Sequence, residues 1–142
     1  MDNLLQIKNG EKVSRADIPQ VSFVDFSKTL IEIADNAGYI VQFFAYKEGE
    51  ANNLLAVVRQ DTKLYVIGCE VDNTFPSLTA SNEKFHMFER EIAEQYGIKP
   101  ENHPWLKLVR YHANYQGNPD VFENNYKEDI PGNYPYFKVE GE

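Results

Sequence analysis

Segment 85–110 constrains the fold more than any other part of this sequence, because it joins an amphipathic helix to a proline-rich turn. Its first half spaces apolar residues in the way that one buried helix face requires. These residues are Phe85, Phe88, Ile92 and Tyr96. Gly97 can take the left-handed conformation that ends helices, and Pro100 cannot continue one. We therefore predict a helix over about 83–96, a sharp stop, and an extended segment that begins near Trp105.

The chain before this segment predicts a second helix and a three-stranded meander. Ser22 can cap a helix, with Asp25 at the capping-box position, and an apolar stripe continues up to Gly38, which we expect to end it. Runs rich in Val, Ile, Tyr and Phe follow at 39–46, 54–59 and 64–71. Connection 60–63 is short enough for a hairpin, whereas we expect 47–53 to form a long polar loop. Because neither connection could hold a crossover helix, antiparallel pairing is expected.

The two ends of the chain lack a periodic apolar pattern. Residues 1–20 are polar, and we expect a loosely held arm that contains a short strand at most. Residues 111–142 hold three prolines, and acidic residues outnumber basic ones there. We predict an extended tail or linker that needs another surface to order it. The chain is thus divided into an α+β domain at 1–110 and a tail at 111–142.

The composition excludes several classes of function. A chain of 142 residues with 42% hydrophobic content suffices for one domain with a core. The net charge of −8 argues against a nucleic-acid or anionic-membrane surface, since both need clustered Lys and Arg. The single cysteine, Cys69, excludes a CxxC site, and we interpret it as a buried apolar residue of a strand. No signal peptide or membrane span is apparent, so we expect a cytoplasmic protein without direct membrane insertion.

No metal or cofactor site is predicted. The three histidines, His86, His103 and His112, lack the spacing of a zinc site, and only one cysteine exists to join them. The glycine-rich loops that cradle phosphates are also absent from the sequence. We therefore expect neither a metal nor a nucleotide cofactor.

Helix 83–96 carries charged residues opposite its apolar face, and two interpretations are open. Glu91 and Glu94 lie one turn apart and, with His103, could form the acid–base site of a small enzyme or ligand-binding domain. Carboxylates around an exposed helix more often face solvent. We favour the solvated interpretation for the glutamates of this face, which are Glu89, Glu91 and Glu94.

Residues 99–106, which we call the elbow, combine two prolines, a histidine and the only tryptophan of the chain. One interpretation is that His103 bonds to nearby backbone while Trp105 fills the core. The other is that the elbow docks a protein partner, because Trp is frequent at interface hot spots. The residues alone leave both interpretations open.

At this point the chain resembles the family of the small hydrophilic subunit of NADH-quinone oxidoreductase (complex I), whose hallmark reads roughly ERExxDxFGIxFxGHPDLRR. The matching residues are Glu89-Arg90-Glu91-Ile92, Tyr96-Gly97-Ile98, His103-Pro104 and Leu106. Segment 76–79 also fits the run that leads into this helix in that family. The resemblance covers about residues 22–110. It implies a two-layer α+β sandwich, with a mostly antiparallel sheet packed by two helices, and no cofactor.

Departures from the hallmark indicate a particular branch of this family. Glu94 replaces the aspartate, Asn102 replaces the glycine before His-Pro, and segment 105–107 reads Trp-Leu-Lys where Asp-Leu-Arg is usual. This wording is similar to that of energy-converting nickel-iron hydrogenases of the formate-hydrogenlyase type, whose large subunit often carries this domain at its N-terminus. Segment 134–142 resembles the linker that runs into their hydrogenase domain. The ending at Glu142 then favours an excised N-terminal domain over a standalone subunit.

The resemblance implies a non-catalytic structural and assembly domain of a membrane-attached hydrogenase complex, with no activity of its own. Its partners would be the catalytic hydrogenase large subunit or domain, which has a counterpart in complex I, and an adjacent iron-sulfur subunit, at the cytoplasmic face of the membrane. The residues expected to contact the partner are Glu89, Arg90, Glu91, His103, Pro104, Trp105 and Leu106. The alternatives are a standalone small hydrophilic subunit of complex I and, in another class, the small enzyme or ligand-binding domain described above.

Overall fold

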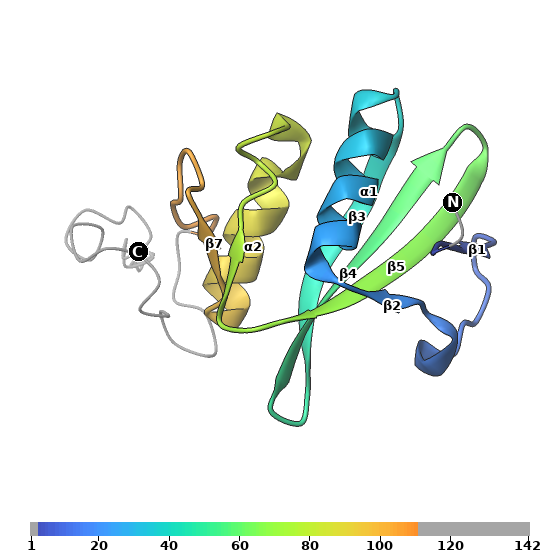
Figure 1. Ribbon diagram of the computed structural model, residues 1–142, viewed down its shortest axis with the longest axis horizontal. Coiled ribbons are helices and arrows are strands. Elements are labelled where there is room, and N and C mark those ends of the chain that lie inside the picture. The colour runs from blue at the N-terminus through green and yellow to red at the C-terminus, as the bar shows by residue number, and fades with distance from the viewer. Residues whose placement is uncertain (1–2, 111–142) are drawn as a thin grey trace, which may run out of the picture.

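The computed structural model describes residues 3–110, which form a mostly antiparallel sheet packed by two helices (Figure 1). The predicted α+β class and the predicted sheet and helices are therefore confirmed. In chain order the elements are β1 (Leu5–Ile7), the short 3₁₀ helix η1 (Arg15–Asp17), β2 (Gln20–Val21), α1 (Phe23–Asp35), β3 (Tyr39–Glu48), β4 (Ala51–Gln60), β5 (Lys63–Val71), β6 (Thr74–Pro76), the 3₁₀ helix η2 (Glu83–Phe85), α2 (His86–Tyr96) and β7 (Lys99–Glu101). The tail predicted at 111–142 lies outside the described residues.

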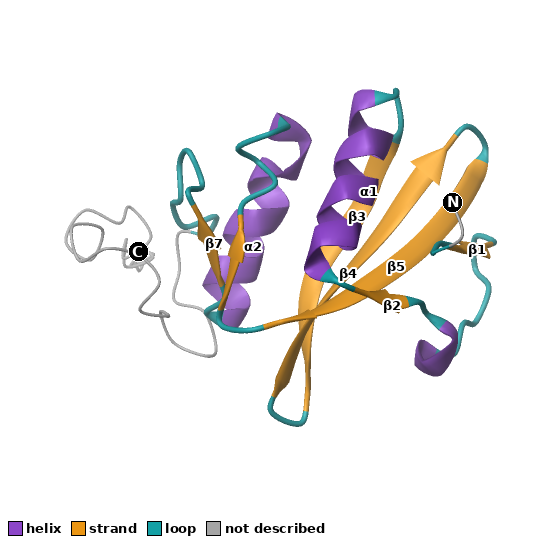
Figure 2. Cartoon of the chain, in the orientation of Figure 1, coloured by secondary structure: helices purple, strands orange, loops and turns teal. Residues whose placement is uncertain are grey.

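The main sheet has the strand order β1-β5-β4-β3, and β2 adds to it by pairing with β5. Strands β3, β4 and β5 form the predicted antiparallel meander. The prediction of a long polar loop at 47–53 is wrong. Glu48 pairs directly with Ala51, so the connection is a tight turn, and Gly49 supplies the positive φ of 60° that the turn requires. The resulting β3–β4 hairpin extends beyond the body of the sheet (Figure 2).

The N-terminal arm is held more firmly than its sequence predicts. Strand β1 pairs antiparallel with β5, and β2 pairs with β5 in the parallel sense. Between them, Arg15 reaches the far strand of the meander, where it forms an ion pair with Glu48 at 2.8 Å and lies over the ring of Tyr46. The short strands of this arm have too few residues for a recognisable alternation, which is why the pattern does not show them.

Helix α1 begins as predicted and ends earlier. The Ser22 hydroxyl accepts a hydrogen bond from the backbone N–H of Asp25 at 3.1 Å, which confirms the cap. The helix was expected to continue up to Gly38, but Asn36 is its C-cap and Ala37 takes the left-handed conformation, with φ of 61°. Gly38 is needed for another reason: a β-carbon there would lie 2.5 Å from the carbonyl oxygen of Ile33.

Phe43 of β3 joins the two helices to the sheet. Its ring lies 5.9 Å from that of Phe26 on α1, 6.1 Å from that of Phe85 in η2 and 6.4 Å from that of Phe88 on α2, measured between centroids. Burying a side chain of this size contributes roughly 2–3 kcal/mol, so these rings are a large part of the core. Cys69 belongs to the same core and is fully buried, as predicted.

Helix α2 confirms the predicted helix and its stop, since it ends at Tyr96 and Gly97 is left-handed with φ of 69°. The extended segment that follows begins earlier than predicted. Strand β7 starts two residues after Gly97 and pairs in parallel with β6. Within residues 3–110, no helix is long and apolar enough to cross a bilayer.

Candidate functional site

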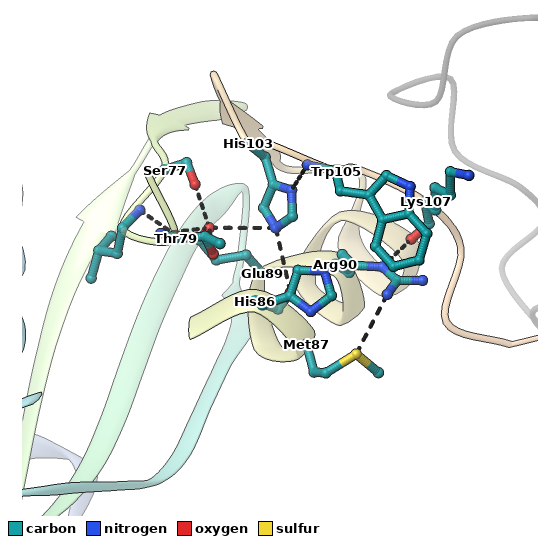
Figure 3. A network of polar contacts seen from close by, with 10 residues as sticks. Ser77, Thr79, His86, Met87, Glu89, Arg90, His103, Trp105 and Lys107 are labelled. Carbon is teal, nitrogen blue, oxygen red and sulfur yellow. Dashed lines mark hydrogen bonds and ion pairs between the residues drawn. The ribbon is translucent and has the colours of Figure 1, made fainter. Parts of the chain in front are cut away.

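The polar side of α2 is enclosed between two irregular stretches of chain. The bridge at 77–79 follows β6 on one side, and residues 103–110 follow β7 on the other. Figure 3 shows side chains of α2 directed at both stretches. Every residue for which the sequence predicts a site role lies on α2 or on this second stretch.

Glu89 is the centre of the first contact, and it is fully buried at 0% exposure. Its carboxylate accepts hydrogen bonds from the Ser77 hydroxyl at 2.6 Å, the Thr79 hydroxyl at 2.6 Å, and the backbone N–H groups of Leu78 at 2.6 Å and Thr79 at 3.3 Å (Figure 3). Burial raises the pKa of Glu89, and these four hydrogen bonds oppose the rise. The prediction of a solvated glutamate is therefore wrong here.

His103 packs against the same carboxylate from the elbow. Its imidazole is enclosed, and its Nε2 lies 3.9 Å from Oε2 of Glu89. Nδ1 accepts a hydrogen bond from the backbone N–H of Trp105 at 3.0 Å, so the proton of the neutral ring is on Nε2, which faces the carbonyl of His86 at 3.4 Å. Desolvation lowers the pKa of His103, and the charges of His86 and Arg90 lower it further, against the opposing hydrogen bond to His86. The predicted bond from His103 to nearby backbone is confirmed.

Trp105 does not fill the core, and that part of the first interpretation is wrong. The side chain is 52% exposed, and Met87 nearby is 50% exposed. Its ring stacks on His86 at 5.7 Å with an interplanar angle of 3°. Two cations lie over the ring, with the guanidinium carbon of Arg90 at 5.0 Å and the Nζ of Lys107 at 4.7 Å from its centroid. An exposed indole is thus fixed in orientation by its neighbours.

Arg90 and Glu94 hold the backbone of the second stretch, and both are buried, at 7% and 1% exposure. Arg90 donates to the carbonyls of Lys107 and Leu108. Glu94 accepts from the backbone N–H groups of Val109 and Arg110. The prediction of a solvated side chain is therefore wrong for Glu94 as well as for Glu89.

Glu91 is the one of the three glutamates that faces outward. Its carboxylate pairs with the Arg110 guanidinium at 2.5 Å, and the same guanidinium lies 3.6 Å from Glu94. The acid–base site that combines Glu91, Glu94 and His103 has no support in this arrangement, because His103 packs against Glu89 instead. One cavity of about 420 Å³ lies beside α1 and another of about 540 Å³ lies beside β2, and neither is lined by these three residues.

Several residues of this site were not singled out from the sequence alone. The bridge residues Ser77 and Thr79 supply hydrogen-bond donors, His86 and Lys107 lie against the indole, and Met87 accepts a hydrogen bond from Arg90. The signal that could have found the donors is a Ser-x-Thr run before a helix with a glutamate in its first turn. Among the described residues, no group of three or more His, Cys, Asp or Glu side chains is placed to hold a metal ion.

The sequence matches the model of a known protein family. The family model described as "Respiratory-chain NADH dehydrogenase, 30 Kd subunit" matches residues 16–127, which is well over half of the chain. No curated protein matches the sequence. The matched range includes all of α2, the bridge before it and the elbow.

Proposed function

This chain belongs to the family of the 30 kDa subunit of respiratory-chain NADH dehydrogenase, and we propose that it is a non-catalytic structural and assembly component which docks onto the catalytic subunit of an oxidoreductase complex. The family is one of subunits of such a complex. The docking role, the surface that performs it and the identity of the partner are the proposal.

The observation that carries the proposal is the exposed, oriented indole of Trp105. An apolar ring with half of its surface in water is unfavourable for the chain alone, and a second exposed apolar side chain, Met87, lies on the same side of α2. The indole is held by stacking on His86 and by a backbone bond to His103, so little conformational entropy is lost when a partner covers it. Oriented aromatic residues of this kind are typical of binding hot spots.

The expected contact residues divide into two groups by burial. Trp105, Pro104 and Glu91 reach the surface and are proposed to touch the partner directly. The remaining expected residues are Glu89, Arg90, His103 and Leu106, which are buried or partly buried. We assign these the task of shaping the elbow, because all four are at least partly buried, and Glu89, Arg90 and His103 contact this chain's own backbone.

We propose that the partner is the large subunit or domain of a membrane-attached nickel-iron hydrogenase of the formate-hydrogenlyase type, with an iron-sulfur subunit adjacent and the complex on the cytoplasmic face of the membrane. The support is the Trp-Leu-Lys sequence of segment 105–107, which departs from the complex I hallmark. The second candidate is the corresponding large subunit of NADH dehydrogenase itself, and the description of the matching family favours it.

Co-purification tests the proposal and separates the two partners. The tagged 142-residue chain is co-expressed with the large subunit of a formate-hydrogenlyase-type hydrogenase and, in parallel, with the corresponding large subunit of a complex I. The proposal expects a stoichiometric complex with the hydrogenase subunit. Recovery with the complex I protein alone would support the second candidate, and recovery of a folded chain with neither would contradict the docking role.

A further inference from the structure

Residues 107–110 belong to no helix or strand, yet four of their backbone groups are bonded to side chains of α2. The Nε and Nη2 atoms of Arg90 donate to the carbonyls of Lys107 at 2.7 Å and Leu108 at 2.6 Å. Oε2 of Glu94 accepts the N–H groups of Val109 at 2.6 Å and Arg110 at 3.2 Å. We call Arg90, Glu94 and these four backbone groups the clasp.

The clasp satisfies the backbone hydrogen-bonding groups of residues 107–110, as a neighbouring strand does in a sheet. Arg90 and Glu94 are four residues apart, so they lie on the same side of α2, one turn after the other. The guanidinium satisfies two successive carbonyls, and the carboxylate satisfies the two amides that follow. Because both side chains are almost wholly buried, these are charge-assisted bonds shielded from water, which are the strong class of hydrogen bond.

We propose that Arg90 and Glu94 are positioning residues, which set the point and the direction in which the chain leaves the domain after Arg110. The inference rests on the proposed docking function, because the residues that follow Arg110 are then delivered to the partner from a defined place. It differs from the role expected for Arg90 from the sequence, which was a direct contact with the partner.

The same guanidinium links the clasp to the docking surface. Arg90 lies 5.0 Å from the centroid of the Trp105 ring and donates to the sulfur of Met87 at 3.5 Å. The indole and the backbone of residues 107–108, which leads to Arg110, are therefore held relative to each other by one side chain. A partner would meet both as a single preorganised surface, which reduces the entropy lost on binding.

Amide hydrogen exchange on the 142-residue chain tests the clasp directly. In Glu94→Ala the N–H groups of Val109 and Arg110 lose their acceptor, and we expect their exchange to accelerate by roughly tenfold to a hundredfold. The matched control is Glu91→Ala, three residues earlier on the same helix, because it removes only the ion pair with the Arg110 side chain. This control should alter the two rates by less than about threefold.

A distance measurement tests the positioning role, which a merely stabilising contact would not show. Spin labels are attached at Val24→Cys on the exposed side of α1 and at Tyr111→Cys, the first residue after the described range. Cys69 stays in place, since burial raises its pKa to about 12 and leaves the thiol unreactive. We expect a narrow distance distribution in the otherwise unaltered chain and in Glu91→Ala.

The clasp variants should broaden this distribution while the domain stays folded, with a single cooperative thermal transition. If Glu94→Ala does not fold, Arg90→Lys is used instead. It keeps the charge but removes the planar guanidinium that donates to two carbonyls at once, and the same broadening is expected. An unchanged distribution and unchanged exchange in a folded clasp variant would overturn the inference. Because no partner is present, failure of the wild-type chain to bind a large subunit would count against the proposed function and not against the clasp.

Discussion

Among single residues, Glu89 shows how a charged side chain becomes structural. Its carboxylate is enclosed by four donors from the bridge. Replacing one carboxylate oxygen with an amide nitrogen therefore leaves a buried N–H group facing another donor. We expect Glu89→Gln to lower the free energy of unfolding by about 2 kcal/mol. Urea denaturation at neutral pH measures this loss.

The control for this variant is Glu83→Gln, which makes the same chemical change at an exposed position just before α2. Its effect should stay within about 0.5 kcal/mol. Equal effects of the two variants would mean that the four hydrogen bonds do not stabilise the fold.

His103 makes the stability of the domain depend on pH. Its folded pKa lies below the ordinary value of 6.5, so between those two values the unfolded chain binds more protons than the folded one. The stabilisation by neutral His103 is present above pH 6.5 and is lost as the pH falls from there through the folded pKa. Protonation would also remove the acceptor that Nδ1 offers to the Trp105 backbone.

Comparison with His103→Gln isolates this contribution from those of titrating groups elsewhere in the chain, which both proteins share. We expect the unfolding free energy of the wild type, relative to the variant, to fall as the pH is lowered below 6.5. A relative stability that rises or stays flat over that interval would show that the imidazole is not held neutral.

The sequence was least informative about which charges are buried. The spacing of Glu89, Glu91 and Glu94 on α2 predicts only that Glu91 and Glu94 share a face and that all three lie outside the apolar stripe. Burial depends on donors that come from 77–79 and from 107–110, and the sequence does not show that these segments approach the helix. Only Glu91, whose partner is the Arg110 side chain at the surface, behaves as the pattern predicts.

At the scale of elements, the end of α1 separates two properties of glycine. Ala37 has the left-handed φ of 61° that glycine adopts without strain, whereas Gly38 is required by its closeness to Ile33. We expect Ala37→Gly to raise the free energy of unfolding by about 0.5–1 kcal/mol. Gly38→Ala should lower it by about 1–3 kcal/mol, because the new methyl group meets the Ile33 carbonyl.

The two variants are expected to change the free energy of unfolding in opposite directions. Thermal and urea unfolding measures both effects. Destabilisation by Ala37→Gly would show that the conformation of this residue carries no strain. A neutral Gly38→Ala would show that the end of the helix can shift to admit a side chain.

The helices and the three long strands could be predicted because each has its own period of apolar residues, and caps such as Ser22 and Gly97 mark their ends. The short strands β1, β2, β6 and β7 could not, since two or three residues carry no period. The tight turn at Gly49 was missed because the polar residues 47, 48, 50, 52 and 53 look like a loop, although Asn52 and Asn53 are buried parts of β4.

For the whole molecule, the buried charges and the exposed indole have one explanation. Charged side chains of α2 are used internally to fix the bridge, the elbow and residues 107–110, and this leaves Trp105 and Met87 at the surface. A family whose members are subunits of a complex has a reason to keep such a surface, because a partner covers it. We therefore regard the indole as the central residue of the proposed docking surface.

The affinity of the chain for its large subunit is the measurement that tests this claim most directly. Trp105→Ala should weaken binding by about 2 kcal/mol or more, close to thirtyfold in Kd, with unfolding of the free chain almost unchanged. Tyr39→Ala, an exposed aromatic residue on β3, is the matched control and should bind as the wild type does. Equal affinities for wild type and Trp105→Ala, measured by titration calorimetry on folded proteins, would contradict the docking role of the indole.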